Sequence, residues 1–329
     1  MTELDTSLTE LPDDSFVKPK EDVYHSIPED TTLPEPEDFV DFVRDLRPNA
    51  CMLDAWEIRQ NTVAETELDL KLPLEKTIDF WKAHMLHLCS DECKNEFLEH
   101  LTYFTEDIVK IEKGTRGQTD NKNWKAARNE LLTSSNFKTI CHSTNMDNTA
   151  KYLMKDSSIN EEHLPPPIAY GRKNEPKARD LFLKAHRFRH RKCKIDVPGL
   201  IISSSDPMLG CSSDGIVDCS ICGQFLIEIK CMHSQQNFHP SPALLAMKIC
   251  EKTDDKLTII KQHRYNYQIQ GQMGITGIKK CVLIGFTNKG ICPVDVPFDE
   301  DMWSSMRSSL VKFYHNSYLP ELLRQNNLM

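Results

Sequence analysis

The stretch that decides the fold is Asp206–Cys231, DPMLGCSSDGIVDCSICGQFLIEIKC. Its last seven residues, FLIEIKC, are mostly apolar and predict a buried β-strand. Side chains alternate between the two faces of a strand, so Glu228 and Lys230 share one face while Ile229 points into the core. Two charges on one face of a buried strand are costly unless they form a pair or bind a metal ion. The loop that carries Asp214 can fold back beside them, which predicts an acidic cup with one ammonium group at its edge.

The composition describes an ordinary soluble protein of 329 residues, 39 % of them hydrophobic and 27 % charged. No apolar run reaches the roughly 18 residues that a membrane span requires, so we expect no membrane partner. The first residues, MTELDTSLTELPDD, have neither the basic nor the apolar region of a secretory signal, and they are too acidic for a transit peptide. We therefore expect an intracellular protein of the nucleus or cytoplasm.

Charge is distributed unevenly along the chain. Residues 1–70 contain 19 acidic and 5 basic side chains, a balance of −14, whereas the whole chain carries −9. The remainder is therefore mildly basic, at +5, which permits a polyanionic partner for the C-terminal part.

Three regions follow from the pattern along the chain. Residues 1–48 are rich in Asp, Glu, Pro and Thr and predict a largely disordered acidic tail, with one short helix at 39–46. Residues 49–113 predict a helical accessory region, because apolar residues recur at helical spacing from Leu74 onward. Residues 114–329 interleave helices and strands, which indicates a mixed α/β (α+β) domain.

The elements expected in this last domain can be stated by residue range. Helices are predicted from near Asn123, within 169–192 after a proline triplet, and over 242–249, 263–277 and 300–323. Strands are predicted within 199–205, 216–219, 225–231, 281–288 and 291–298, and 251–256 is expected to be a polar loop.

The twelve cysteines are scattered irregularly and predict reduced thiols. Cys219 and Cys222 form a lone CxxC. A structural zinc ion there would need two further ligands, and Cys211 and Cys231 are the nearest thiols in the sequence. A turn with two unligated thiols is the simpler interpretation.

Three acidic side chains suit a hard cation. Glu175, Asp214 and Glu228 would offer carboxylate oxygens, the ligands that Mg²⁺ and Mn²⁺ prefer. Lys230 could orient an attacking water or stabilise charge on a phosphate. The residues alone leave open a purely structural Glu–Lys pair.

Two further groups are candidates for phosphate contact. Thr133-Ser134-Ser135 is expected to cap a new helix, and Arg128 could join its hydroxyl groups around an anion. The basic segment HRFRHRK, residues 186–192, is either a solvated helix end or a phosphate contact.

Five ordered segments across about residues 115–325 resemble the YqaJ-type viral recombinase family, relatives of phage lambda exonuclease among the PD-(D/E)XK nucleases. These are Trp124 with Arg128 and Thr133-Ser134-Ser135; Gly171 with Asn174-Glu175 and Ala178-Arg179; Cys211-Ser212-Ser213-Asp214-Gly215; Leu226-Ile227-Glu228-Ile229-Lys230-Cys231; and Tyr265-x-Tyr267-Gln268-x-Gln270-x-Gln272. The chain departs from the family pattern at Ser213, where relatives have Pro, at Leu131, where many have a basic residue, and at Met232, where Pro is usual.

The resemblance implies a PD-(D/E)XK core, a central mixed sheet flanked by helices, and a specific set of site residues. Metal ligands would be Glu175, Asp214, Glu228 and the backbone carbonyl of Ile229. Lys230 and Gln268 would act at the scissile phosphate, and Arg128 and Ser135 would hold a 5′ phosphate.

The implied activity is that of a Mg²⁺- or Mn²⁺-dependent 5′→3′ exonuclease on double-stranded DNA ends. The implied settings are recombination, repair, or viral and mobile-element DNA processing, with a ring-shaped homotrimer and a single-strand annealing protein as expected partners. Two alternatives stay open: a catalytically silent module that binds DNA ends or protein, and an endonuclease that shares the same core.

Overall fold

The computed structural model describes residues 73–83, 104–155 and 164–328, all of which belong to the compact unit Glu67–Met329. The predicted acidic tail, the short helix at 39–46 and most of the helical accessory region lie outside the described residues. Within the described ranges, no helix is long and apolar enough to cross a membrane.

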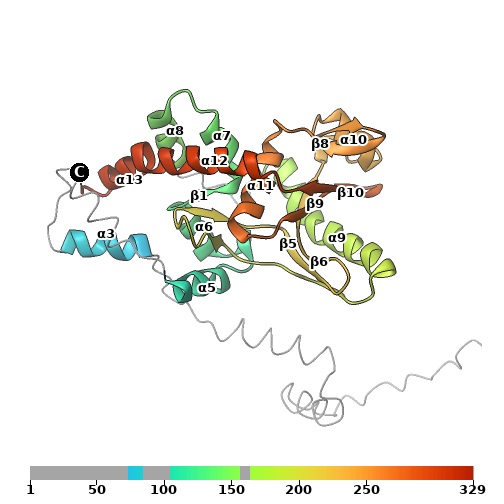
Figure 1. The fold of residues 1–329 in the computed structure, drawn as a ribbon, viewed down its shortest axis with the longest axis horizontal. Coiled ribbons are helices and arrows are strands. Elements are labelled where there is room, and N and C mark those ends of the chain that lie inside the picture. Colours follow the sequence, from blue (N-terminus) through green and yellow to red (C-terminus); the bar gives the residue numbers. More distant parts are fainter. Residues whose placement is uncertain (1–72, 84–103, 156–163, 329) are drawn as a thin grey trace, which may run out of the picture. The chain divides into compact units, whose positions relative to one another are not determined.

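The described chain alternates helices with short and long strands (Figure 1). The α-helices are α3 (Pro73–Ala83), α5 (Thr105–Gly114), α6 (Lys122–Arg128), α7 (Phe137–Cys141), α8 (Met146–Leu153), α9 (Pro166–Arg189), α10 (Pro240–Ala246), α11 (Arg264–Thr276), α12 (Glu300–Phe313) and α13 (Leu319–Gln325). The 3₁₀ turns are η1 (Gln118–Asp120), η2 (Ser134–Asn136) and η4 (His233–Gln235), and η5 (Tyr314–Tyr318) is a π-helical turn. The strands are β1 (Leu132–Thr133), β2 (Cys193–Asp196), β3 (Ile201–Ile202), β4 (Leu209–Cys211), β5 (Gly215–Cys219), β6 (Gly223–Cys231), β7 (Cys250–Thr253), β8 (Lys256–Ile259), β9 (Lys280–Thr287) and β10 (Gly290–Pro297).

The central sheet has five strands in the order β10-β9-β6-β5-β2. β6 and β9 run parallel, with Glu228 opposite Leu283, and the other neighbouring pairs are antiparallel. A three-stranded sheet, β1-β4-β3, and the β7–β8 hairpin complete the strands. The predicted α/β (α+β) class with a central mixed sheet is confirmed.

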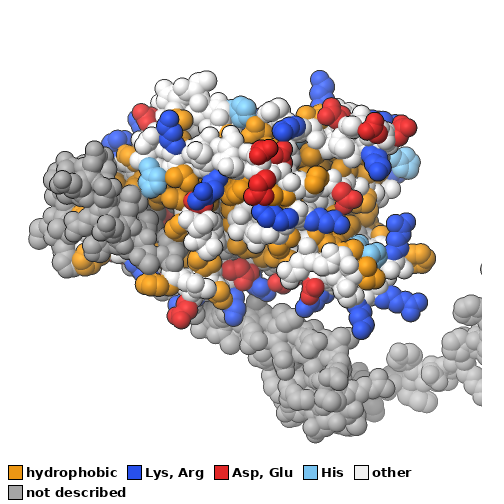
Figure 2. Space-filling model, in the orientation of Figure 1, with side chains coloured by type: hydrophobic (Ala, Val, Ile, Leu, Met, Phe, Trp, Pro, Cys, Tyr) orange, Lys and Arg blue, Asp and Glu red, His pale blue; other side chains and the backbone are white. Residues whose placement is uncertain are grey.

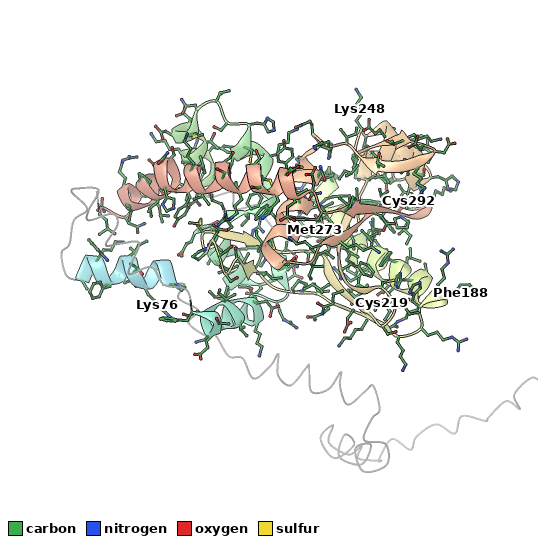
Figure 3. The ribbon with its side chains drawn as sticks, viewed as in Figure 1. Lys76, Phe188, Cys219, Lys248, Met273 and Cys292 are labelled. Carbon is green, nitrogen blue, oxygen red and sulfur yellow. The ribbon has the colours of Figure 1, made fainter. Side chains whose placement is uncertain are left out.

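Helices cover both faces of this sheet, and β6 contributes alternate residues to the two sides. Phe225, Ile227 and Ile229 pack with α9 in one cluster of buried residues. Leu226 packs with α10 and α11 in another, which includes Met273 in the interior (Figure 3). Glu228 and Lys230 have the same parity as Leu226, so they lie on the α11 face, and Ile229 is buried on the other face as predicted.

α11 approaches the segment η2–α7 very closely. A Cβ atom added at Gly271 would lie 2.5 Å from the ring of Phe137 and 3.4 Å from the Cβ of Ser134. Only a glycine therefore allows this contact, which brings the Thr133–Ser135 segment against the helix that carries Gln268 and Gln272.

Several elements differ from the prediction for clear physical reasons. Residues 251–256, predicted as a loop, form part of the β7–β8 hairpin. Asp254 and Asp255 have φ of +48° and +60°, as a two-residue type I′ turn requires. The exposed side chains of this hairpin lack an apolar alternation, which is why periodicity did not reveal it.

Two predicted helices have different boundaries. α9 begins at Pro166, within the proline triplet, because the first turn of a helix leaves N–H groups unpaired and tolerates proline. The closing helix predicted over 300–323 is interrupted by the π-helical turn η5, which ends two residues before Pro320, a residue with no N–H to donate.

Candidate active site

Glu228 is the centre of the candidate site. It lies in the middle of the hydrogen-bonded part of β6 and is only 1 % exposed. The Nζ of Lys230, two residues along the same face, donates to Glu228 Oε1 at 2.5 Å. The predicted side-by-side placement of these two charges is therefore what the structure has, and the ammonium also lies 4.6 Å from the centre of the Tyr265 ring.

α11 supplies two amide donors to the same carboxylate. Gln268 Nε2 donates to Glu228 Oε1 at 2.6 Å, and Gln272 Nε2 donates to Oε2 at 2.8 Å. Residues four apart lie on one face of a helix, which explains how both amides reach Glu228. Gln268 was predicted as a site residue and Gln272 was not, although the spacing of four residues between them in the glutamine-rich helix was a usable signal.

Asp214 and Glu175 are joined to this centre through backbone and side-chain contacts. Asp214 Oδ2 accepts the Ile229 N–H at 2.5 Å, which ties the loop before β5 to β6. Arg179 Nη2 donates to Glu175 Oε1 at 2.6 Å, and its Nε donates to the Asp214 carbonyl at 2.9 Å. Arg179 thus connects α9 to this loop, a role that the sequence motif did not reveal.

The pKa shifts record the crowding of three carboxylates. Burial, followed by the charges of Glu228 and Glu175, raises the pKa of Asp214 well above its ordinary value. Burial also raises the pKa of Glu175, against the opposing effect of Arg179 and with a further contribution from Glu228. Burial would lower the pKa of Lys230, but the Glu228 and Asp214 carboxylates outweigh it and raise that pKa. The centre therefore has more negative charge than Lys230 alone offsets.

The donor set suits a hard divalent cation. Glu175, Asp214 and Glu228 offer carboxylate oxygens, and a cation among them would relieve the repulsion that raises the pKa values of the first two. Gln272 Oε1, beside Glu228, is buried and has no hydrogen-bond partner among the described residues. β5 begins at Gly215, opposite Ile227, so the Ile229 peptide lies beyond that pairing; its carbonyl as a metal ligand stays a prediction.

Arg128 stands at a second polar group, next to the hydroxyls of Thr133 and Ser135. Its Nη2 donates to Ser135 Oγ at 3.2 Å and to Thr133 Oγ1 at 3.4 Å. No carboxylate within the described part of the chain forms an ion pair with Arg128. Burial lowers the pKa of its guanidinium to about 10, with a smaller opposing effect from Cys211.

The arrangement differs from the predicted helix cap. The Thr133 side chain makes no capping hydrogen bond, and the hydroxyl groups face Arg128 instead. A cation held by hydroxyl groups without an ion-pair partner favours an anion at this position.

Trp124 connects this group to the carboxylates. The Arg128 guanidinium lies 4.3 Å from the centre of the Trp124 ring, and Trp124 Nε1 donates to Ser212 Oγ at 2.8 Å. Ser212 is two residues before Asp214, and its carbonyl accepts from Gln272 Nε2 at 3.2 Å. A cation–π contact and two hydrogen bonds therefore connect the candidate anion group to the segment that carries Asp214.

Two departures from the family pattern have a structural explanation. Leu131, which stands where many relatives have a basic residue, is buried in a cluster with Ile111, Ala127 and Leu200. Ser213 is fully buried and its carbonyl accepts from Gln118 Nε2 at 3.0 Å, which holds the turn that proline would stiffen.

The suggested zinc ligands Cys211 and Cys231 are wrong. The side chains that meet the Cys219–Cys222 pair are His186 and His190, at the end of α9. These two histidines belong to the basic segment that was expected to contact phosphate or solvent. Their approach depends on the packing of α9 against β5 and β6, which no sequence spacing reveals.

Basic and acidic side chains are interspersed on the face shown in Figure 2. The net positive balance of the chain after residue 70 is therefore not gathered into one patch on that face. A nucleic-acid contact would depend on particular side chains such as Arg128 rather than on a broad basic field.

No curated protein matches the sequence of this chain. Among solved structures, an alkaline exonuclease from Laribacter hongkongensis is similar, with 20 % identity and a TM-score of 0.45, over 63 % of this chain and 95 % of that chain. A phage-related exonuclease from Haemophilus somnus 129PT has 12 % identity and a TM-score of 0.35, over 59 % and 96 %. The Shutoff and Exonuclease Protein from Kaposi's sarcoma-associated herpesvirus has 11 % identity and a TM-score of 0.39, over 73 % and 79 %.

A family comparison identifies the region that carries the candidate site. Residues 123–279, from α6 to just beyond α11, match the YqaJ-like viral recombinase domain. This region includes every residue of the carboxylate centre and of the Arg128 group. The similarity to the YqaJ-like viral recombinase domain therefore covers the part of the chain that holds the candidate site.

Proposed function

We propose that this protein is a metal-dependent deoxyribonuclease that acts as a 5′→3′ exonuclease on double-stranded DNA ends. The observation that carries the proposal is the buried Glu228 carboxylate, hydrogen-bonded by Lys230 and Gln268 beside Asp214. A purely structural ion pair needs one carboxylate, whereas this centre assembles three.

The proposed metal ligands are Glu175, Asp214, Glu228 and the carbonyl of Ile229. A bound Mg²⁺ or Mn²⁺ would polarise a phosphoryl oxygen and make a bound water more acidic. Gln268 and Gln272 fix the orientation of the Glu228 carboxylate, and the Ile229 N–H fixes that of Asp214. Such fixed ligands keep the site in its reactive geometry before the substrate arrives.

Lys230 acts as a charged donor in this proposal. Burial lowers its pKa, but the Glu228 and Asp214 carboxylates outweigh that effect and raise it, which favours the ammonium form of the side chain. The ammonium donates to the scissile phosphate or to the attacking water and offsets the charge that develops on phosphorus.

The preference for a 5′ end is assigned to Arg128 and Ser135, with Thr133 beside them. A terminal phosphate monoester carries more negative charge than an internal diester, so a guanidinium without a carboxylate partner favours the end. We call Arg128, Thr133 and Ser135 the phosphate anchor. Contacts through Trp124 and Ser212 fix the position of this anchor relative to the carboxylates, and therefore determine which bond is cut.

The larger setting of the activity is also a proposal. Residues 114–329 would form the nuclease domain, with 1–48 and 49–113 as an acidic tail and a helical accessory region. The homotrimer, the annealing protein, the pathway and the nuclear or cytoplasmic compartment are predictions that need their own experiments.

Digestion of DNA tests the proposal directly. With Mg²⁺ and a linear duplex that bears 5′ phosphates, the wild type should release nucleotides, while Lys230→Ala and Asp214→Asn should be inactive. Asp218→Asn is the matched control, since Asp218 is an exposed aspartate on β5, the strand that begins directly after Asp214. Equal digestion by all four proteins would exclude this site.

The same assay separates the two alternatives. Cleavage of a covalently closed circle as fast as a linear duplex would indicate an endonuclease. Binding of DNA ends without any metal-dependent cleavage by the wild type would indicate a silent binding module.

A further inference from the structure

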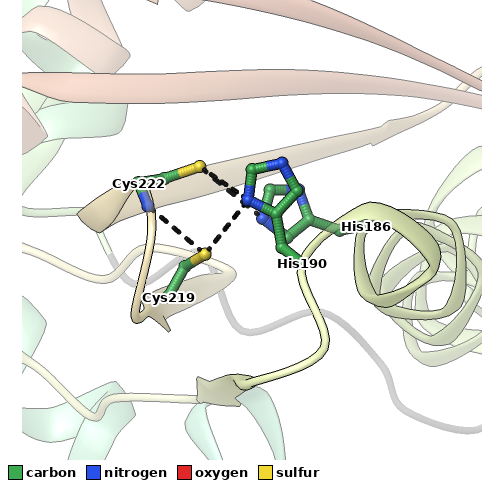
Figure 4. Close-up of side chains that lie close together, drawn as sticks. All are labelled: His186, His190, Cys219 and Cys222. Carbon is green, nitrogen blue, oxygen red and sulfur yellow. Dashed lines mark hydrogen bonds between the residues drawn. The ribbon is translucent and has the colours of Figure 1, made fainter.

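Four side chains of the metal-binding type meet where the C-terminal end of α9 approaches the turn between β5 and β6. His186 lies in the last turn of α9 and His190 directly follows the helix, while Cys219 ends β5 and Cys222 lies in the turn before β6. Figure 4 shows both imidazole rings directed at the two sulfur atoms. One ligand atom from each residue lies within 4.8 Å of the other three.

The separations fit one tetrahedral ion. With Zn–S of about 2.3 Å and Zn–N of about 2.0 Å, the edges of a tetrahedron measure roughly 3.3–3.8 Å. In the structure, Sγ of Cys222 lies 3.3 Å from His190 Nδ1 and 4.0 Å from His186 Nε2. Sγ of Cys219 lies 3.5 Å from the same His190 Nδ1. The remaining separations are no more than 4.8 Å, so shifts of at most about 1 Å would complete the coordination.

The local sequence provides the spacing that such a site needs. The pairs are C-x₂-C and H-x₃-H, both within the usual range for structural zinc. Histidines four apart on a helix share one face, and Gly223, with φ of +72°, lets the chain turn sharply after the second cysteine. No Cβ clash forbids another residue at Gly223, so the backbone conformation itself is the requirement.

The surroundings also support a bound cation. The Cys222 N–H donates to the Cys219 sulfur at 3.4 Å, a contact that stabilises negative charge on a ligand. The His186 ring packs against Phe182 and Phe225, with ring centres 5.6 Å and 5.5 Å apart. These rings restrict the orientation of the imidazole.

We propose that His186, His190, Cys219 and Cys222 bind a structural zinc ion that fastens the end of α9 to the β5–β6 hairpin. Zinc is the ion of choice because two thiolates and two imidazoles form a soft, neutralising, tetrahedral set, whereas Mg²⁺ and Ca²⁺ prefer oxygen. All four positions are filled by protein, which is typical of a structural rather than a catalytic site.

The ion acts far from the carboxylate centre. His186 follows Glu175 by eleven residues of helix, about 16 Å at 1.5 Å per residue. Its function is to fix the orientation of α9, and thereby of Glu175, relative to the strands that carry Asp214 and Glu228. The zinc site does not depend on the proposed nuclease activity.

Metal analysis of the full-length protein tests the proposal. Purified under reducing conditions and dialysed against a weak chelator, the wild type should retain about one zinc per chain. Cys222→Ser and His186→Ala should each reduce the zinc content at least about tenfold and lower the melting temperature. Cys193→Ser is the matched control, since Cys193 is a buried thiol directly opposite Cys219 on β2 but outside the cluster.

Cobalt provides a readout that needs no variant to fold. Protein stripped of zinc and titrated with Co²⁺ should develop the intense visible bands of a tetrahedral cobalt–thiolate complex, which added Zn²⁺ then removes. The proposal would be overturned if the wild type contained no zinc and developed no cobalt bands. It would also be overturned by a Cys219–Cys222 disulfide in the reduced preparation, or by full zinc content in both ligand variants.

Discussion

α9 and the β5–β6 hairpin carry two different groups of side chains at their two ends. At one end, three carboxylates and Lys230 offer oxygen atoms and an excess of negative charge. At the other, two imidazoles and two thiols converge, with their ligand atoms within 4.8 Å of one another. α9 and the β5–β6 hairpin contribute to both groups, whereas α11 supplies amide donors only to the carboxylate end.

The difference in ligands indicates which of the two groups would exchange its metal ion readily. Carboxylates hold Mg²⁺ loosely, with waters still bound, which leaves positions for a phosphate. Four nitrogen and sulfur ligands enclose zinc and leave no position open. We therefore assign substrate chemistry to the carboxylate end and mechanical support to the other.

The largest expected effect comes from a substitution that disrupts the carboxylate centre and leaves the His/Cys cluster intact. Asp214→Asn should reduce nuclease activity by about 10³-fold or more, since it removes a metal ligand without changing the shape of the side chain. Zinc content should stay at the wild-type value, as measured by metal analysis. The melting temperature at neutral pH should not fall, because burial and the neighbouring carboxylates raise the pKa of Asp214 and make its charged form costly. A simultaneous loss of zinc would show that the two ends are not independent.

The anchor should affect where the enzyme starts rather than how it cuts. Arg128→Ala should reduce the preference for 5′-phosphate over 5′-hydroxyl ends by about 10–100-fold, because a charge-assisted contact to a buried anion is lost. Arg128→Lys keeps the positive charge but loses the two-pronged donor geometry of the guanidinium. Its preference for 5′-phosphate ends should lie between those of the wild type and Arg128→Ala. Initial rates on the two substrates provide the measurement; an unchanged ratio in Arg128→Ala would remove this residue from the role.

Gln272 distinguishes support of the site from support of the fold. Gln272→Leu should reduce kcat about tenfold, because Glu228 Oε2 loses its amide donor. Gln270→Leu is the matched control: it is equally buried on the same helix but bonds to the Pro297 carbonyl and the Asp299 N–H. Both changes should cost stability on the order of 1–3 kcal/mol in urea denaturation. Equal kcat values in the two variants would make Gln272 merely structural.

Glu130 provides a measure of what a buried carboxylate costs when one of its oxygens has no donor among the described residues. Its Oε2 is buried without a hydrogen-bond partner among the described residues, unlike the carboxylate of Glu228. Burial, followed by the charges of Glu75 and Asp79, raises the pKa of Glu130 from 4.5 to about 8. Because the folded state binds the proton more tightly, its stabilising contribution is present below pH 4.5 and is lost as pH rises to about 8.

Glu130→Gln mimics the protonated form and should remove this loss. The variant should match the wild type near pH 4 and exceed its free energy of unfolding by on the order of 3 kcal/mol at pH 7, with nuclease activity unchanged. Urea denaturation across this pH range provides the test, and parallel curves for the two proteins would contradict the assignment.

The parts of the molecule that were predictable are those set by local periodicity. The alternation in FLIEIKC predicted that Glu228 and Lys230 share one face, whereas Gln268 was predicted only from the resemblance of its helix to the family motif. The short strands β1 and β4 were missed because two or three residues carry no period. Arg179 and the histidines of α9 were missed because their partners are distant in sequence, and only packing of the helix on the sheet brings them together.

Calorimetric titration of Mn²⁺ into protein dialysed against a weak chelator tests the central claim most directly. We predict a binding heat for the wild type and none for Asp214→Asn, while both proteins retain one zinc per chain. Equal Mn²⁺ binding by the two proteins would contradict the claim that the carboxylates around Glu228 form the catalytic metal centre.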